Sequence, residues 1–109
     1  MLYKNYSSNE KHHWMSQLNI LLAKHLHDPL LTNAFLASQL GISERTFYLK
    51  VKRAIDKTPN QYIRQLRLEK AHDLLTSGNF YIVKEVLPLT GFIKVGYFYK
   101  VFRLSLIHI

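Results

Sequence analysis

The stretch LASQLGISERTFYLKVKR, residues 36–53, places one glycine between two short segments that each have the periodicity of a helix. Gly41 can adopt the left-handed conformation that ends a helix, and Ser43 can accept a hydrogen bond from the free amides that begin the next one. The second segment also has an apolar stripe at helical spacing, formed by Phe47, Val51 and Ala54. Two short helices joined by a tight turn restrict the fold to a helical one and predict a helix-turn-helix unit.

The rest of the chain continues the helical pattern, without a sustained strand alternation. The expected helices cover residues 14–27, 33–40, 44–54, 59–77, 82–89 and 94–103. Residues 1–13 are polar and predict a leader or the remnant of a linker. The helix over 59–77 is apolar over a wide arc, which suits a helix buried by neighbours on two sides. The sequence therefore predicts an all-α domain over residues 14–109, with lobe one at about 14–56 and lobe two at about 80–103 joined by this long central helix.

The second half of the chain repeats the basic and aromatic pattern of the first. FYLKVKR at residues 47–53 and YFYKVFR at residues 97–103 align at an offset of fifty positions, and the same offset pairs Gly41 with Gly91. Both halves thus predict a helix, a glycine turn and a basic helix. In a helix-turn-helix the second helix presents its side chains to the major groove of DNA, so these two basic helices are the candidate DNA-binding elements.

The net charge of +8 favours a polyanionic partner, because 15 Lys and Arg outnumber 7 Asp and Glu. Nucleic acid and an acidic membrane surface both satisfy that charge. No apolar run approaches the roughly 18 residues of a membrane span, and the first residues lack the apolar core of a signal peptide. We therefore expect a cytoplasmic protein with no membrane partner. Cysteine is absent, which excludes disulfides and thiolate metal sites.

Candidate groups for catalysis or metal binding are weak. The paired histidines at residues 12–13 and 25–27 lack the i, i+3 or i+4 spacing that places two metal ligands on one helix face. Gly91 and Gly96 have the gap of a phosphate loop without the Lys and Ser or Thr that complete it. Scattered Ser, His and Asp form no nucleophilic constellation. We therefore expect no enzyme, no metal ion and no cofactor.

Four motifs together resemble a known family: LxxxLGISERxxYxKxK, TPNQYIRQLRLEKAHDLL, VKEVxxxxGF and YFxKxF. They are similar to the DNA-binding domain of AraC-type transcription regulators, especially the version that ends bacterial hybrid two-component sensors. The resemblance covers residues 31–103, and its most specific block is residues 59–75. It implies two helix-turn-helix lobes that place recognition helices in successive major grooves of double-stranded DNA, as a transcription regulator or its output domain. RNA polymerase or a longer regulator is a further implied partner, and the oligomeric state is left open.

The resemblance also implies DNA-binding positions on the two basic helices. Base-facing positions in the helix over 44–54 fall on Arg45, Thr46, Tyr48 and Leu49, with Ser43 at its start. In the last helix they fall on Val95, Gly96, Tyr97 and Lys100. Phosphate contacts are expected from neighbouring cations, namely Lys50, Lys52, Arg53, Lys94, Lys100 and Arg103. For Tyr48, contact with a thymine methyl group or a sugar and ordinary packing are both expected roles. The family's core positions fall on Phe47, Val51, Phe98 and Phe102, so its register has one more residue after Gly91 than after Gly41.

The chain departs from the family at several positions. Leu49 stands where the family often has arginine, Asp56 where it has glycine, and Leu87 and Pro88 where it prefers a small alanine and ordinary helix formers. A proline inside a helix costs about 3 kcal/mol or more, so we expect the helix over 82–89 to be kinked or shortened. The stretch LSLIHI replaces the family's closing glycine turn and last helix, which is expected to expose Phe98 or Phe102. Lobe two is therefore expected to be incomplete and less stable.

Two other function classes fit parts of this pattern. A degenerate DNA-binding domain would act as a protein-interaction module through the apolar surface left by the missing last helix. A basic amphipathic membrane binder is disfavoured, because the cations are concentrated on particular helices beside a real core.

Overall fold

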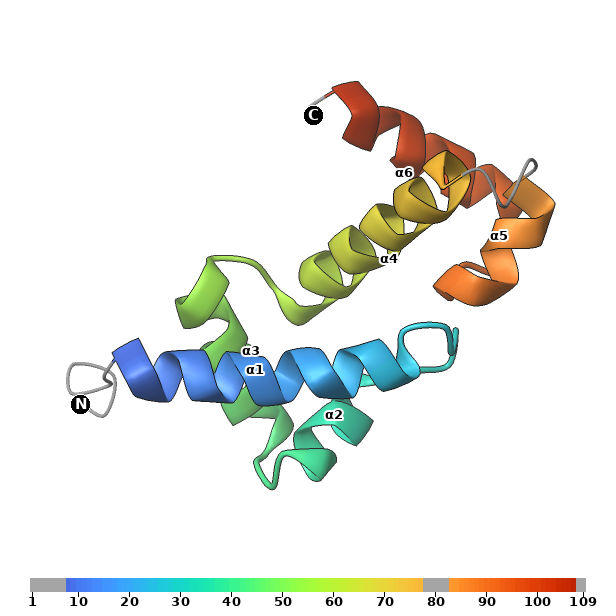
Figure 1. Ribbon diagram of the computed structural model, residues 1–109. Helices are drawn as coiled ribbons and strands as arrows, with labels where there is room; N and C mark the ends of the chain where they lie inside the picture. Colours follow the sequence, from blue (N-terminus) through green and yellow to red (C-terminus); the bar gives the residue numbers. More distant parts are fainter. Residues whose placement is uncertain (1–7, 78–82, 108–109) are drawn as a thin grey trace. The chain divides into compact units, whose positions relative to one another are not determined.

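The structure, a computed structural model, describes residues 8–77 and 83–107 (Figure 1). The described residues form helices and no strand, as expected for the all-α class. The helices are α1 (Ser8–His25), α2 (Asn33–Gln39), α3 (Glu44–Ile55), α4 (Pro59–Thr76), α5 (Val83–Thr90) and α6 (Val95–Ile107). The chain divides into two units, the first with α1 to α3 and the second with residues 26–30 and α4 to α6. No described helix is both long and apolar enough to cross a membrane.

Two helix ends differ from the sequence prediction by more than two positions. α1 begins at Ser8 rather than at Trp14, so residues 8–13 of the stretch predicted to be a leader or linker remnant are helical. Periodicity detects only the buried side of a helix, and this first turn and a half is polar while still containing good helix formers such as Glu10 and Lys11. α6 continues past Arg103 to Ile107, because the residues that follow contain no glycine or proline to stop it. The expected stop of α4 at Gly78 lies outside the described residues.

The first unit is built around the turn that the sequence predicted. α2 ends in a Schellman motif, in which the amide of Ile42 donates to the carbonyl of Ala37 and the amide of Gly41 donates to that of Ser38, at 3.0 and 3.1 Å. Gly41 has the expected positive φ of +72°, a conformation that costs a residue with a Cβ atom roughly 1 kcal/mol or more. The turn therefore depends on glycine at this position.

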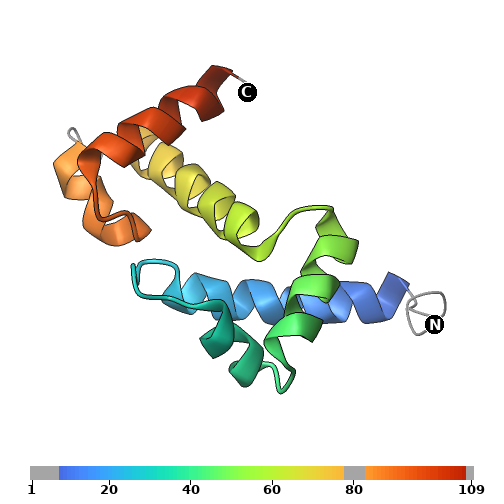
Figure 2. The same cartoon turned by 180° about the vertical axis from the view of Figure 1, so that it is seen from behind.

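The core of the first unit joins all three of its helices. α3 crosses α1 in both views (Figures 1 and 2). The buried side chains are Trp14, Leu18 and Leu22 of α1, Leu36 and Ala37 of α2, and Phe47 and Val51 of α3. The stripe that predicted α3 is therefore the buried side of that helix, with Ala54 half-buried at its end.

The core of the second unit centres on Phe98 of α6. Phe98 is fully buried, and its ring lies 5.2 Å from that of Phe92 in an edge-to-face arrangement and 5.1 Å from that of Phe102 in a stacked one. Val86 and Leu87 of α5 complete this cluster together with residues of α4. Of the two residues expected to be exposed, Phe98 or Phe102, Phe98 is enclosed by α4, α5 and its aromatic neighbours, whereas Phe102 is only partly buried.

Pro88 lies inside α5, as the sequence predicted, in a helix of only eight residues. Its side chain is exposed, so the ring points away from the core. Two positions further on, α5 ends at Thr90, whose buried hydroxyl donates a hydrogen bond of 3.0 Å to the carbonyl of Leu87. This bond satisfies a carbonyl at the helix end that has no intrahelical partner.

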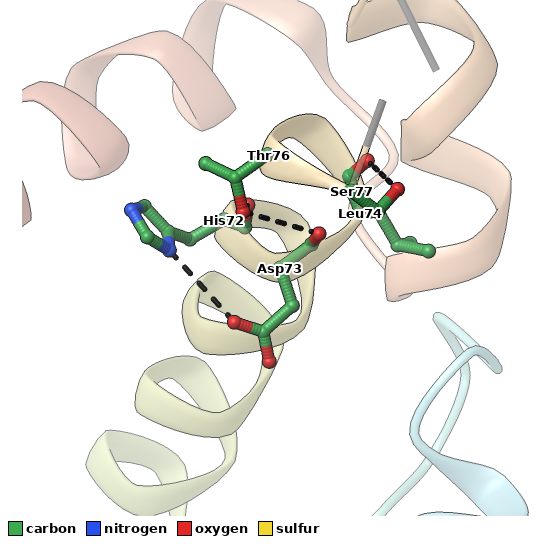
Figure 3. A network of polar contacts seen from close by, with 5 residues as sticks. All are labelled: His72, Asp73, Leu74, Thr76 and Ser77. Carbon is green, nitrogen blue, oxygen red and sulfur yellow. Dashed lines mark hydrogen bonds and ion pairs between the residues drawn. The ribbon is translucent and has the colours of Figure 1, made fainter. Parts of the chain in front are cut away.

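The C-terminal end of α4 is closed by hydroxyl groups rather than by a glycine within the described residues (Figure 3). The hydroxyl of Thr76 donates to the carbonyl oxygens of His72 and Asp73 at 2.8 and 3.3 Å, and that of Ser77 donates to the carbonyl of Leu74 at 2.8 Å. These bonds occupy carbonyls of the last turn that lack a helical partner. The His72 ring lies 3.8 Å from the Asp73 carboxylate in an exposed contact.

An arginine of α4 holds the segment of residues 26–30 within the second unit. Arg67 donates one hydrogen bond to the carbonyl of Leu26 and another to that of Asp28, at 3.1 and 2.8 Å. Burial lowers the pKa of the Arg67 guanidinium, an effect that the Asp28 carboxylate opposes. Gly91, in the turn between α5 and α6, has a φ of +83° and packs directly against this contact. A Cβ atom at Gly91 would overlap both the Leu26 carbonyl oxygen and the Arg67 guanidinium.

Candidate nucleic-acid interface

The exposed side of α3 is the first part of the candidate interface. At about 100° per residue, the buried Phe47 and Val51 define one side of the helix and leave the other to solvent. That solvent side contains the exposed residues Arg45, Tyr48, Lys52 and Arg53 and the half-buried Thr46 and Leu49. One short helix therefore brings together three cations, a tyrosine and a leucine among the residues expected to bind DNA.

The first turn of α3 is fixed by its cap. The hydroxyl of Ser43 accepts from the amide of Thr46 at 3.1 Å and donates to the hydroxyl of Thr46 at 3.0 Å. Ser43 is therefore the N-cap that the sequence predicted, and both hydroxyls are engaged with each other. Arg45 lies in this turn, so its backbone is held by the cap while its side chain stays exposed.

Lys50 lies away from the other cations of α3. Its ammonium nitrogen is 5.2 Å from the centre of the Trp14 ring, and the same ring packs against Phe47 at 6.3 Å. A cation over an aromatic face contributes about 0.5–1 kcal/mol at an exposed site. The contact gives Lys50 a structural role between α1 and α3, and its expected contact with phosphate stays a prediction.

The end of α3 carries an acidic residue in an unusual conformation. Asp56 is its C-cap and has a φ of +55°, the left-handed region in which the family's glycine is favoured. Its carboxylate lies 3.7 Å from the ammonium group of Lys52, one turn back on the solvent side. The departure from the family at this position thus adds both backbone strain and a negative charge next to a cation of the candidate interface.

α6 of the second unit repeats the geometry of α3 with a shift of one position. α3 begins three positions after Gly41, whereas α6 begins four positions after Gly91, as the family register implied. In both helices the residue before the first turn accepts a hydrogen bond from the amide of the buried phenylalanine: Ser43 from Phe47 and Lys94 from Phe98. The two helices therefore correspond at an offset of 51 positions, not at the offset of fifty that the sequence repeat indicates.

This offset assigns a counterpart to each exposed position of α3. The pairs are Arg45 with Gly96, Thr46 with Tyr97, Tyr48 with Tyr99, Leu49 with Lys100, and Lys52 with Arg103. Tyr99, whose side chain is 49% exposed, was missed by the sequence reasoning. Val95 corresponds to Glu44, the first residue of α3, so it has no base-facing counterpart; its side chain lies outside the described part of the structure.

The solvent side of α6 contains the remaining expected residues. Lys94, Tyr97, Lys100 and Arg103 are all exposed, and so is Gly96. Lys94 takes the place of Ser43, but its ammonium group cannot accept a hydrogen bond from the first turn of the helix. The expected residues thus form one set on each unit, and the set on α6 lacks both the cap and the first-turn arginine of the set on α3.

Metal binding has no support among the side chains that the structure describes, since no three His, Cys, Asp or Glu residues are grouped there as ligands. His25 instead packs edge-to-face against the ring of Phe35, with ring centres 4.9 Å apart. That contact fixes one member of the histidine pair at residues 25–27 in a packing role.

Known proteins resemble this chain in both sequence and fold. A family model described as a helix-turn-helix domain matches residues 36–106. The HTH-type transcriptional activator RhaS of Escherichia coli is 34% identical over 91 residues, which cover 81% of this chain and 32% of RhaS. Histidine kinase P4 of Formosa agariphila is 33% identical over 67 residues, 62% of this chain and 5% of that protein. The chain thus spans a third or less of the length of these relatives.

A solved structure shares the fold. The C-terminal domain of the two-component response regulator YesN from Fusobacterium nucleatum superposes with a TM-score of 0.76, over 85% of this chain and 95% of that domain. At 22% sequence identity, this similarity shows the arrangement of the helices and nothing about the chemistry of their surfaces.

Proposed function

Because the chain belongs to the AraC-type helix-turn-helix family, we propose that it binds double-stranded DNA in a sequence-specific manner and regulates transcription, with α3 as a recognition helix. The observation that carries this proposal is the solvent side of α3, on which Arg45, Lys52 and Arg53 are exposed opposite the buried Phe47. A helix of this kind fits the major groove, where cations bind phosphates and an arginine in the first turn reads base edges.

Arg45 is the proposed base reader of the first unit. The guanidinium group can donate two parallel hydrogen bonds to the O6 and N7 atoms of guanine, the commonest specific contact in the major groove. Its position after the Ser43 cap supports this role, because a rigid first turn limits where the guanidinium can reach. Lys52 and Arg53 lie about two turns further along the same side and are the proposed phosphate contacts.

The second unit is proposed to bind an adjacent part of the same DNA. Lys94, Lys100 and Arg103 are exposed along α6 and provide positive charge for phosphates. Because α6 has different side chains from α3 at the corresponding positions, the preferred DNA site should be asymmetric.

Regulation is proposed to be exerted by a longer protein in which this chain is the output domain. RhaS is named as a transcriptional activator, and P4 as a histidine kinase, and this chain matches only a part of each. RNA polymerase or the remainder of such a regulator is the further partner that this proposal includes.

Selection of bound sites from a pool of random duplexes tests the proposal. We expect one sequence to be enriched, and we expect the affinity for it to fall with salt by about 0.9 log units per log unit of salt for each neutralised phosphate. Arg45→Ala should cost about 1–3 kcal/mol at one or two base pairs of that site and should leave binding to random DNA unchanged. Arg64→Ala is the matched control, because Arg64 is an exposed arginine of α4 outside the candidate interface.

Three results would contradict parts of the proposal. Equal losses on selected and random DNA would make Arg45 a phosphate contact. A pool without enrichment would exclude sequence-specific binding. A flat salt response on DNA, with strong binding to anionic vesicles, would favour a membrane-surface function instead.

A further inference from the structure

We propose that Tyr99 is a specificity-determining residue of the second unit and that it contacts the methyl group of a thymine in the DNA half-site bound by α6. The inference rests on the proposed DNA-binding function. It starts from the correspondence of the two helices, in which Phe47 and Phe98 are both fully buried and both donate a backbone hydrogen bond to the carbonyl four residues earlier.

The correspondence extends along the flank of each helix that lies next to the core. Lys50 covers the Trp14 ring in the first unit, and Val101, its counterpart, is 9% exposed in the second. At an offset of 51 positions, these two residues occupy equivalent places beside the buried phenylalanine of their helices. The alternative offset of fifty would pair the buried Val101 with the buried Val51 but would place Phe98 opposite the exposed Tyr48.

The same register puts Tyr48 and Tyr99 on equivalent solvent-facing positions. The two tyrosines are 44% and 49% exposed, so each presents part of its ring to solvent. The Tyr99 ring makes an edge-to-face contact with Phe98, with ring centres 6.0 Å apart, so it packs against the buried side of α6 while remaining half exposed. An aromatic ring packed in this way has few accessible rotamers, so it loses little conformational entropy when its apolar surface contacts DNA.

The residue that α3 uses as its proposed guanine reader has no equivalent on α6. Gly96 takes the place of Arg45, and a Cβ atom built there would meet nothing within 4 Å, so the position has no side chain and open space around it. Apolar contact with the thymine methyl group is the major-groove interaction that an aromatic side chain can make, and that methyl group is what distinguishes thymine from the other bases there. The second half-site should therefore be read mainly through thymine rather than through guanine.

Replacement of thymine by uracil tests this inference, because it removes the methyl group and leaves the hydrogen-bonding groups in place. Sites are first selected with the whole chain. Replacement of one thymine in the half-site bound by α6 by uracil should then lower the affinity of the protein for that site about fourfold. Tyr99→Ala should abolish that difference, and Tyr99→Phe should keep it. Tyr48→Ala is the matched control and should change the effect of uracil only in the other half-site.

A second variant tests the position that glycine leaves open. Gly96→Arg should introduce a preference for guanine in the second half-site that the unchanged protein lacks, since it restores the side chain found at Arg45. Circular dichroism of each variant checks that α6 is still folded.

The outcomes separate this inference from the function on which it rests. Failure to enrich any sequence would overturn both. If a site is enriched but Tyr99→Ala does not change its response to uracil, the role of Tyr99 is overturned while DNA binding stands. The same conclusion follows if every effect of uracil lies in the half-site bound by α3.

Discussion

Gly41 and Gly91 both have a positive φ, but only Gly91 is closely packed. Replacing each by alanine therefore separates the cost of the backbone conformation, measured at Gly41, from the cost of lost packing at Gly91. Gly41 and Gly91 have φ values of +72° and +83°, so replacement by alanine costs each roughly 1–2 kcal/mol from the left-handed conformation alone. At Gly41 a Cβ atom would meet nothing within 4 Å. We therefore expect Gly41→Ala to lower the free energy of unfolding by about 1 kcal/mol.

Gly91→Ala should cost several times as much. Its Cβ atom would overlap the Leu26 carbonyl oxygen and lie 2.5 Å from Nε of Arg67, and the carbonyl oxygen is a backbone atom that cannot rotate away. The substitution must displace the guanidinium, which donates to the carbonyls of Leu26 and Asp28. Loss of even one hydrogen bond to a charged group costs about 1.5–3 kcal/mol, so the total is about 3–5 kcal/mol.

Urea unfolding followed by circular dichroism measures this difference. A whole domain is stable by only about 5–15 kcal/mol. Gly91→Ala should therefore shift the unfolding midpoint to a much lower urea concentration, or leave the second unit unfolded without urea. Fluorescence of Trp14, the single tryptophan of the chain, reports the first unit separately. Gly96→Ala is the control, because a Cβ atom there meets nothing and no positive φ is needed; it should stabilise the protein by about 0.5–1 kcal/mol. Equal costs at Gly41 and Gly91 would refute the packing argument.

Three further predictions follow from the candidate interface and the second unit. Lys50→Ala should lower the free energy of unfolding by about 0.5–1 kcal/mol through loss of the contact with Trp14. Lys52→Ala should reduce the salt slope of DNA binding by about one, as measured by fluorescence anisotropy over a range of salt concentrations. Asp56→Gly should raise stability by up to about 1 kcal/mol in thermal unfolding, since glycine adopts the positive φ without strain, and should tighten DNA binding by removing a carboxylate next to Lys52; weaker binding would contradict this. Backbone amides of α5 and α6 should exchange with solvent faster than those of α1 to α3, because Pro88 inside α5 has no amide to donate and Lys94 cannot cap the start of α6; equal protection would contradict the lower stability expected of the second unit.

Local chemistry explains why the turns of the first unit could be predicted from the sequence. A glycine that ends α2, a serine that caps α3 and a proline that begins α4 each act on the backbone within a few positions, so Gly41, Ser43 and Pro59 identify the boundaries without knowledge of the packing. The start of α1 was harder because its first residues are polar and show no apolar periodicity, and the end of α6 was harder because no glycine or proline follows Arg103.

Contacts between distant parts of the chain could not be predicted in the same way. Arg67 donates to carbonyls 41 and 39 positions earlier, and nothing in its immediate sequence distinguishes it from an arginine on the surface. The need for glycine at Gly91 has the same origin, since it depends on an atom of Leu26. The sequence placed Phe98 and Phe102 at core positions but could not show which of them would stay covered; α4, α5 and two aromatic neighbours enclose the ring of Phe98.

The register of α6 shows how sequence similarity and geometry can give different candidate sites. Aligned by letters, the two basic segments match lysine with lysine at Lys50 and Lys100. Aligned by burial, Lys50 lies on the flank that covers Trp14, while Lys100 is exposed and corresponds to Leu49. The backbone hydrogen bonds from Phe47 and Phe98 decide between these alignments, because each fixes the start of its helix relative to its buried side. Side chains on the side of the helix opposite the core are best placed to reach DNA, so the alignment by burial is the one that selects candidate contact residues. It pairs Tyr99 with Tyr48, Val95 with Glu44 and Lys100 with Leu49, and the base-facing role expected of Val95 stays a prediction.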